Sequence, residues 1–556
     1  MASFTNHVAG DPLAALVSPQ WEIRRARFRS AATGIVAITA TFSFYWLRNK
    51  YVGFFYAKPD SIFILFLSSL LGAFAFAFVQ YRQFPRVFSV VTRATATGVL
   101  VYLIIEPSDF TLADSDHANL ATYADWGYWA ALAAAITSLC RPSFLFPAAF
   151  YVISTRFIVR QISGFPLSTL DVQYMMEMAQ FLACSACGLA LIMWIKPHSD
   201  NRITAIFSII DPQLLAICLT FVAFGFHLGN YFWSGYQKLV VGPHLWSWIF
   251  ENQTQNLMVI ALKKGVLPSG ALPLVTQWVF DKFGSLVALS NLSIVVTQLF
   301  SIVAALRLRG LLIASLAYDV LHVGIYFVGG LFFWPWVWNN GSIIVSIRGH
   351  RDEQIGWVPK LCCILTILLG GSANLGGSAR LAWFDVLDIK IAGIQAKTTD
   401  GNWVDVPSSY FLSNSYTVSH GEIDLTATQG HYPPTIWGSV YDYKRAKTSG
   451  QCPPLSPVMD SESIEKRNER LEMLSKFLLA HHKKMVRRAA EYGKYNYYLR
   501  SNHQPSNPWL YSDFNHLEVD RIRSYRLVTQ SVCLKLSGGK LEERELKRDE
   551  VKFDVR

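Results

Sequence analysis

The chain has 556 residues, of which 52% are hydrophobic and only 16% are charged, and its mean hydropathy is +0.26. Soluble globular proteins carry about 25% charged residues, so this composition excludes a disordered chain, a basic nucleic-acid-binding protein and an ordinary cytosolic enzyme. The net charge of +11 fits arginine and lysine beside membrane spans, where the positive-inside rule concentrates them on the cytoplasmic side.

Apolar segments recur along the first two thirds of the chain. Residues 1–20 lack a long apolar core, which argues against a cleaved signal peptide, and residues 1–30 are predicted to form an N-terminal cytoplasmic segment. Most later segments approach the roughly 20 residues that a hydrocarbon core requires. The predicted spans are 31–48, 61–80, 87–105, 124–140, 143–160, 177–195, 213–236, 285–306, 310–334 and 358–376. We therefore expect a transmembrane domain over 31–376.

Basic residues alternate along the predicted loops. They occupy every second loop, in the order Arg24 to Arg29, Arg82 and Arg86, Arg141, Lys196 and Arg202, and Arg307 and Arg309. This pattern predicts a cytoplasmic N-terminus, and an even number of spans returns the C-terminus to the same side. The sequence thus predicts an integral, multi-pass membrane protein with both termini in the cytoplasm, without identifying the membrane. One loop, 341–357, disagrees: it should lie outside, yet it contains Arg348 and Arg351.

Beyond about residue 380 the pattern becomes that of a small soluble domain. Residues 381–424 alternate in polarity and contain Asp400-Gly401 between AGIQAK and NWVDV, which predicts a β-hairpin. The apolar spacing over 461–492 predicts one amphipathic helix, and the last 30 residues predict further strand. We therefore expect residues 381–556 to form a cytoplasmic α+β tail.

The eight cysteines predict neither a metal site nor a redox site. Most lie in predicted spans, where cysteine acts as a small apolar residue. Cys184-Ser-Ala-Cys187 has the C-x-x-C form, but redox motifs need solvent access and a lowered thiol pKa, so its mid-span position favours helix packing. No second cysteine pair completes a zinc spacing, and no metal is predicted.

Ionisable residues inside spans are costly, and each is therefore a candidate functional residue. The first group lies in FHLGNYFWSGYQKL, residues 226–239. His227, Tyr231, Ser234 and Lys238 are spaced by four, three and four residues, so they share one helix face over about three turns. The alternatives are a Lys238 that snorkels to the interface and a His227 that only hydrogen-bonds between helices.

The second group lies in AYDVLHVGIYF, residues 317–327. Asp319 and His322 share a helix face, and Tyr326 follows four residues later. A carboxylate beside a histidine fixes its tautomer and favours its charged form, so the pair suits proton transfer, ion passage or a buried structural lock. Between the two groups, residues 240–284 include His244 and are too polar to span. They predict an amphipathic or re-entrant segment over the mouth of a pocket.

These two groups carry a resemblance to a known family. YFWSGYQKL, with a short Trp-containing segment after it, resembles the YF-x-x-G-x-x-K-L signature of the vitamin K-dependent γ-carboxylase-like, or HTTM (horizontally transferred transmembrane), superfamily. YDVLHVGIYFVGGLFFWPW is similar to the family's later histidine-containing helix. The resemblance covers roughly residues 20–345 and is sharpest over 226–340.

The resemblance implies a cofactor and two roles. It implies reduced vitamin K or another quinol, Lys238 as the base that deprotonates it, and His322 as the matching helix histidine. An apolar site favours the uncharged amine that a base requires. The region GFPLSTLDVQYMMEMAQF lacks the histidine that family members often carry, and a cytoplasmic tail does not replace the carboxylase's large outer domain. Quinol or other lipid chemistry is therefore favoured over carboxylation of a protein.

The leading prediction is an α-helical polytopic membrane protein of about ten transmembrane helices with a small C-terminal α+β soluble domain. It would be a carboxylase-like or oxidoreductase-like enzyme, in which Lys238 is the base and Asp319 and His322 handle protons. The residues expected to line its cavity are His227, Tyr231, Ser234, Tyr326 and His244. Its expected partners are membrane lipids and a quinone; no nucleic acid is expected, and the sequence identifies no protein partner. The alternatives are a transporter or channel, and a membrane assembly or scaffold protein.

Overall fold

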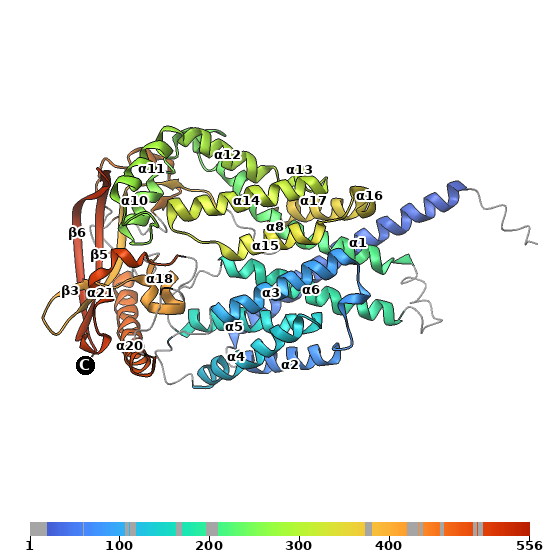
Figure 1. Ribbon diagram of the computed structural model, residues 1–556, viewed down its shortest axis with the longest axis horizontal. Coiled ribbons are helices and arrows are strands. Elements are labelled where there is room, and N and C mark those ends of the chain that lie inside the picture. The colour runs from blue at the N-terminus through green and yellow to red at the C-terminus, as the bar shows by residue number, and fades with distance from the viewer. Residues whose placement is uncertain are drawn as a thin grey trace, which may run out of the picture.

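A computed structural model describes most of the chain. The described residues are 19–58, 61–105, 111, 118–162, 170–195, 209–372, 381–419, 432, 438–455, 461–492, 498 and 504–555. They form a long helical bundle and a C-terminal domain, rich in strands, that packs against one end of it (Figure 1). The predicted change of character near residue 380 coincides with the boundary between these two parts.

The long helices run roughly along the longest dimension of the molecule (Figure 1). They are α1 (Pro19–Ala57), α2 (Ser61–Ala75), α3 (Arg86–Ile105), α4 (Ala118–Ser138), α5 (Leu145–Ile162), α6 (Leu170–Ile195), α8 (Pro212–Val240), α12 (Val287–Leu299), α14 (Leu308–Gly329), α15 (Trp334–Ile347) and α17 (Trp357–Ser372). Each of the ten predicted spans corresponds to one of these helices. Of them, α1, α3, α6, α8 and α14 are long and apolar enough to cross a membrane. A multi-helix apolar bundle is therefore present, but length and composition support fewer spans than ten.

Short elements fill the segment between α8 and α12. They are α9 (Ser247–Glu251), α10 (Asn256–Lys263) and α11 (Pro273–Ser285). The axes of α11 and α12 are bent by 72° relative to each other, so this pair is either a broken span or a re-entrant turn. The re-entrant alternative agrees with the non-spanning segment predicted over 240–284, whereas the broken span does not. The remaining short helices of the bundle are α13 (Ser301–Ala304) and α16 (Asp352–Ile355), with 3-10 turns at Tyr81–Gln83 and Pro142–Phe144.

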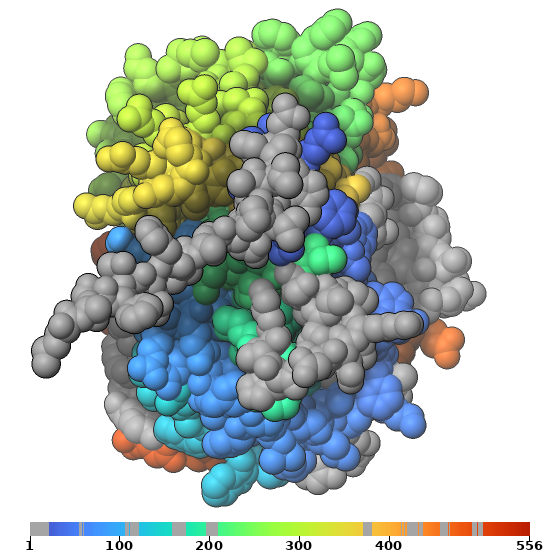
Figure 2. Space-filling view, turned by 90° about the vertical axis from the view of Figure 1, so that its right-hand side faces the viewer, coloured from blue at the N-terminus to red at the C-terminus, as the bar shows by residue number. Residues whose placement is uncertain are grey.

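The bundle has two hydrophobic cores that share α3 and α6. One core forms around α8 and includes residues of α14, α15 and α17, whereas the other joins α2, α4 and α5. Figure 2 views the molecule from the end opposite the C-terminal domain. The green and yellow helices, which belong to the core around α8, lie above the blue and cyan helices, which belong to the other core. Helix α8 is central, because 83% of its apolar window is buried, against 28% for α1 and for α14.

Helix α15 is the long helix that the sequence analysis missed. It has only 14 residues, and Asn339, Asn340, Ser342 and Ser346 make it too polar to resemble a span. All four side chains are nevertheless buried, because α15 packs its polar face into the bundle, as polar residues of membrane helices do.

The extra helix changes the path of the chain. Counting α15, the long helices traverse the bundle an odd number of times, so α1 begins at the end opposite the C-terminal domain (Figure 1). The arginine-rich turns gather at that end: the side chain of Arg86 lies against Gly349, and Asp352 Oδ1 accepts a hydrogen bond of 3.1 Å from the Leu308 N–H. This path through the described residues does not support the prediction that both termini lie on one side. The omission of α15 also made the loop with Arg348 and Arg351 look discordant.

The C-terminal domain is built on a four-stranded antiparallel sheet in the order β3-β2-β5-β6. Its strands are β2 (Asp388–Lys397), β3 (Trp403–Asp405), β5 (Ser524–Ser537) and β6 (Lys540–Asp554), and a separate pair joins β1 (Phe384–Asp385) to β4 (Ser439–Val440). The predicted hairpin is present as β2 and β3, with Gly401 at φ 89° in the turn. The helices of the C-terminal domain are α18 (Ser415–Ser419), α19 (Tyr443–Lys447), α20 (Ser461–Tyr492) and α21 (Ser512–Asn515), with 3-10 turns at Ser408–Asn414, Pro508–Leu510 and Val519–Arg521.

The predicted amphipathic helix is α20, and its apolar stripe covers one face of the sheet. Leu474, Phe477 and Leu478 are buried in a cluster that includes Ile394 of β2 and Leu527 of β5. The alternation of β2 and β5 thus supplies the domain core, and the opposite face of the sheet turns toward α10 and α11.

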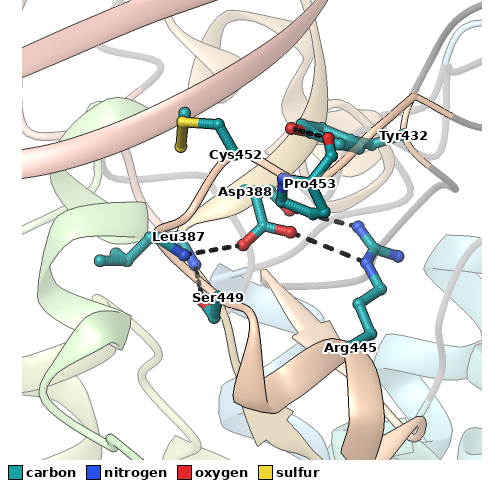
Figure 3. Close-up of a disulfide and its surroundings, with 9 residues drawn as sticks. Leu387, Asp388, Tyr432, Arg445, Ser449, Cys452 and Pro453 are labelled. Atoms are coloured by element: carbon teal, nitrogen blue, oxygen red, sulfur yellow. Dashed lines mark hydrogen bonds and ion pairs between the residues drawn. A yellow bond between two sulfur atoms is a disulfide. The ribbon is translucent and has the colours of Figure 1, made fainter.

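A disulfide between Cys452 and Cys533 joins the segment after α19 to β5 (Figure 3). The same segment is tied to the sheet by the Gly450 N–H, which donates to Asp388 Oδ1 over 3.1 Å, and by the Leu387 N–H, which donates to Ser449 Oγ over 2.8 Å. The sequence analysis missed this bond, because pairing between cysteines 81 residues apart cannot be deduced from spacing.

Candidate functional site on the central helix

Helix α8 carries the first predicted polar group and is well defined at its start. Asp211 is the N-cap, and its carboxylate accepts from the N–H groups of Gln213 and Leu214, while Pro212 occupies the first turn. Gly235, the glycine of the family-like motif, allows close packing: a Cβ there would lie 2.9 Å from Cβ of Gln298 on α12. The predicted stripe is therefore sealed inside the bundle instead of facing lipid.

Asn340 of α15 is the centre of an inner polar cluster. Its Oδ1 lies 2.8 Å from His227 Nε2, and its Nδ2 donates to Asp319 Oδ1 (2.8 Å) and to the Tyr231 hydroxyl (3.1 Å). A carboxylate only accepts hydrogen bonds, so the amide nitrogen must face Asp319 and the amide oxygen must face His227. His227 Nε2 therefore carries the proton in the neutral ring, and Nδ1 is left as an acceptor.

Aromatic rings enclose this inner cluster. Tyr231 stacks on Tyr318 of α14 with ring centroids 3.7 Å apart, so α8 and α14 meet through these two rings. Trp336 lies against His227, Tyr231 and His322, with centroids 5.7, 5.2 and 5.5 Å apart. Within the described part of the chain, His227 Nδ1 and Trp336 Nε1 are both buried without a hydrogen-bond partner. One free acceptor and one free donor complement a hydroxyl group, which can donate and accept.

The second predicted group is only partly brought together. Asp319 joins the inner cluster through Asn340, but His322 Nδ1 hydrogen-bonds the backbone oxygen of Tyr318 over 2.8 Å. The direct Asp319–His322 pair that the sequence predicted is not among the hydrogen bonds of the described residues. Tyr326 is half-buried against Phe332, outside the cluster, and His244 is exposed and stacks on Trp246.

Lys238 belongs to a separate, outer cluster. Its Nζ donates to the backbone oxygens of Ser234 (3.4 Å) and Leu381, and it lies 5.1 Å from the ring centroid of Trp248. The Ser234 hydroxyl accepts from the Leu381 N–H over 3.2 Å. Lys238 lies two helical turns beyond Tyr231, about 10 Å along the axis. The two clusters therefore occupy different depths, and no contact among the described residues joins Lys238 to Asp319 or His322.

Asp385, in β1, is the carboxylate of the outer cluster. It is buried and accepts from Asn252 Nδ2 (2.9 Å) and Trp383 Nε1 (3.0 Å). Burial raises the pKa of Asp385 to about 7, although these two hydrogen bonds and the nearby Lys238 oppose the increase. Trp248 Nε1 donates to the Trp383 oxygen over 2.7 Å, so residues of the predicted 240–284 segment cover the Lys238 site together with the C-terminal domain.

Sequence reasoning missed Asn340 and Asp385, whereas it placed Asn252, with the other polar residues of the 240–284 segment, over the mouth of the pocket. Asn252 lies in the amide-rich run ENQTQN, and Asn340 lies in the aromatic run WPWVWNN, so their polarity was visible in the sequence. Their partners were not visible, because those contacts join positions more than 100 residues apart.

Comparisons with known proteins do not identify a family for this chain. No family model matches the chain, and neither a curated protein nor a solved structure is detectably similar to it. The resemblance to the carboxylase-like superfamily therefore stays a prediction that depends on the motif residues alone.

Proposed function

We propose that this protein is an integral membrane enzyme that takes a proton from a hydroxyl of a lipid-soluble substrate, reduced vitamin K or another quinol, with Lys238 as the base. The observation that carries this proposal is the burial of Lys238, which is only 7% exposed and forms no ion pair within the described part of the chain. A lysine that anchors a helix end keeps its amine in water. Burying an ammonium is expensive when its nearest carboxylate, here Asp385, lies beyond ion-pair distance, and this cost supports a chemical role for Lys238.

The position of the C-terminal domain supports a carboxylase-like arrangement. Leu381, Trp383 and Asp385 belong to the segment that opens this domain, and all three contact Lys238 or its neighbours. The sequence analysis counted the lack of an outer domain against the family, because it put the tail in the cytoplasm. If the Lys238 end of the bundle faces outside, this domain lies on the same side as the carboxylase's outer domain, although it is smaller.

We assign proton handling in the inner cluster to His227 in preference to His322. The Asn340 amide orients His227, as an asparagine does in Cys-His-Asn proteases, and His227 Nδ1 is free to accept a proton. We expect His227→Gln to lower quinol turnover at least tenfold and His322→Gln to lower it less, since proton transfer contributes about 10²–10⁴-fold. Turnover in nanodiscs measures this difference, and His244→Gln at an exposed site is the control. Inactivation by His322→Gln alone would reverse the assignment.

Two features support a cytoplasmic position for the arginine-rich end and an outside position for the C-terminal domain. Arginines concentrate on the cytoplasmic side, and they gather at the end where α1 begins. Disulfides persist in oxidising compartments, and Cys452–Cys533 lies at the other end. The span count consistent with both features is odd.

Labelling with a membrane-impermeant maleimide tests this topology. The two positions are Asn402, exposed in the β2–β3 turn, and Glu353, exposed in α16. In sealed microsomes that carry Cys140→Ser, Cys184→Ser and Cys187→Ser, we expect Glu353→Cys to react at once. Asn402→Cys should react only after detergent is added. Immediate labelling of Asn402→Cys would return the domain to the cytoplasm.

Lipid extraction from the purified protein tests the function itself. We expect mass spectrometry to find a quinone at near-stoichiometric amounts. Added quinol should be consumed only when dioxygen is present, because the deprotonated quinol must pass its electrons to an acceptor, and in the proposed chemistry that acceptor is dioxygen. Solute flux into liposomes without quinol consumption would favour the transporter, and retention of neither lipid nor solute would favour the scaffold.

A further inference from the structure

Asp385 is a buried carboxylate that has no role in the reaction proposed above. Its Oδ1 accepts a hydrogen bond from Trp383 Nε1 (3.0 Å), and its Oδ2 accepts one from Asn252 Nδ2 (2.9 Å). The Asp385 N–H donates to Asn252 Oδ1 over 2.8 Å, and Asn256 Nδ2 donates to the Asp385 backbone oxygen over 3.1 Å. These hydrogen bonds fix both the backbone and the carboxylate, so the side chain cannot swing toward another group without losing them.

Lys238 and Asp385 form an isolated pair of opposite charges. In the described part of the chain, Asp385 is the one charged group whose field reaches Lys238, and Lys238 is the one whose field reaches Asp385. Lys238 Nζ lies 5.1 Å from the ring centroid of Trp248, and Trp248 Nε1 donates to the Trp383 oxygen over 2.7 Å. Trp383 in turn binds Asp385. The two charges therefore belong to one set of contacts, although they lie beyond ion-pair distance.

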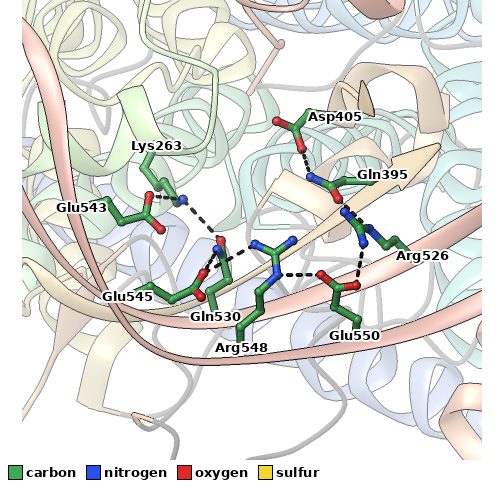
Figure 4. A network of polar contacts seen from close by, with 9 residues as sticks. All are labelled: Lys263, Gln395, Asp405, Arg526, Gln530, Glu543, Glu545, Arg548 and Glu550. Atoms are coloured by element: carbon green, nitrogen blue, oxygen red, sulfur yellow. Dashed lines mark hydrogen bonds and ion pairs between the residues drawn. The ribbon is translucent and has the colours of Figure 1, made fainter. Parts of the chain in front are cut away.

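The sheet of the same domain shows the alternative arrangement, a direct ion pair. Lys263 binds Glu543, and Arg548 binds Glu550 (Figure 4). A direct ion pair favours the charged form of a lysine, so it would keep Lys238 protonated and unable to act as a base. A carboxylate held farther away stabilises an ammonium less strongly, which leaves the amine free to take and release a proton.

We propose, on the basis of the function proposed above, that Asp385 is a positioning residue whose carboxylate stabilises the ammonium formed when Lys238 takes a proton from the quinol. In this step the O–H bond of the quinol breaks and its electron pair stays on the quinol oxygen. The proton forms an N–H bond with Lys238. A cation then occupies a buried site, and the fixed carboxylate lowers the cost of its charge, as the aspartate of a Ser-His-Asp triad does for the imidazolium.

The pH dependence of quinol turnover tests this role. We expect Asp385→Asn to move the acid limb of the kcat/KM profile to lower pH by roughly one unit, because an ammonium without its carboxylate loses its proton more readily. At high pH, kcat should fall about threefold or more, since a weaker base takes the proton more slowly. Asp400→Asn, the same change at an exposed position of the β2–β3 turn, should alter neither. An acid limb that stays in place in Asp385→Asn would overturn the proposal, because a structural aspartate would change the rate alone.

Infrared titration of the Asp385 carboxyl tests the coupling without quinol. Burial raises the pKa of this carboxyl to about 7, and Lys238 opposes the increase. In the full-length protein in nanodiscs, the carboxyl band is assigned by its shift in Asp385→Glu, so the test does not depend on the folding of Asp385→Asn. Lys238→Met should raise this pKa by roughly one further unit. Lys238→Arg keeps a cation at the site and should not raise it.

The two measurements distinguish failure of this coupling from failure of the proposed function. Equal pKa values of the Asp385 carboxyl in Lys238→Met and in the unmodified protein would exclude the coupling, whatever the quinol results. A carboxyl that responds to Lys238→Met in a protein that consumes no quinol would instead contradict the proposed function, and with it the role of Asp385 in the reaction.

Discussion

Replacing Lys238 by arginine should abolish quinol turnover and leave the protein folded. Arginine keeps the positive charge and can still donate to the backbone oxygens of Ser234 and Leu381, but it cannot lose its proton inside a protein. Loss of a general base typically costs about 10²–10⁴-fold in rate, so we expect at least a hundredfold decrease. The measurement is quinol consumption by the protein in nanodiscs, with the thermal unfolding midpoint recorded alongside.

Two controls separate chemistry from folding and binding. Lys282→Arg makes the same change at an exposed position on α11 and should leave the rate unchanged. Quinone that co-purifies with Lys238→Arg at the amount found in the unmodified protein would show that the substrate still binds. Full turnover by Lys238→Arg would end the lysine-base mechanism and, with it, the functional content of the family resemblance.

Removing the disulfide with Cys452→Ser should strongly destabilise the C-terminal domain. The bond closes a loop of 81 residues, and the loss of such a cross-link is expected to cost about 4 kcal/mol through the larger entropy of the unfolded chain. The hydrogen bonds from Gly450 to Asp388 and from Leu387 to Ser449 remain in the variant and should hold the segment only at low denaturant. Denaturant unfolding followed by proteolysis within the C-terminal domain measures the change.

Reduction provides the matched experiment. Adding dithiothreitol to the unmodified protein should lower the midpoint as Cys452→Ser does, and should have no effect on the variant. Cys140→Ser removes an exposed free cysteine at the other end of the bundle and should leave the midpoint unchanged. An unchanged midpoint in Cys452→Ser would mean that the bond does not stabilise the domain, and it would remove one of the two supports for the proposed side of the membrane.

Local patterns in the sequence were sufficient to predict most elements. Hydropathy found ten of the long helices, the 3.6-residue period found α20 and the polar face of α8, and Asp400-Gly401 found the β2–β3 turn. These signals are local, because helix and strand periodicity depend only on which residues face a buried surface. The sequence left open whether Lys238 is buried or reaches the interface, although it lies on the same helix face as His227.

Only the tertiary structure decided which residues meet. From its sequence alone, α15 resembles a polar loop, because a hydropathy average does not show that its asparagines are hydrogen-bonded inside the bundle. Asn340, for example, hydrogen-bonds His227, which lies 113 residues away in the sequence. The same applies to Lys238, which the sequence grouped with Asp319 and which lies instead beside the backbone of Leu381, 143 residues later. Polar groups buried in a bundle must find partners, but the partner is set by how helices pack, and no local pattern encodes that. Because α15 was not counted, the sequence analysis placed the C-terminal domain at the end of the bundle opposite Lys238. In the structure this domain lies beside Lys238.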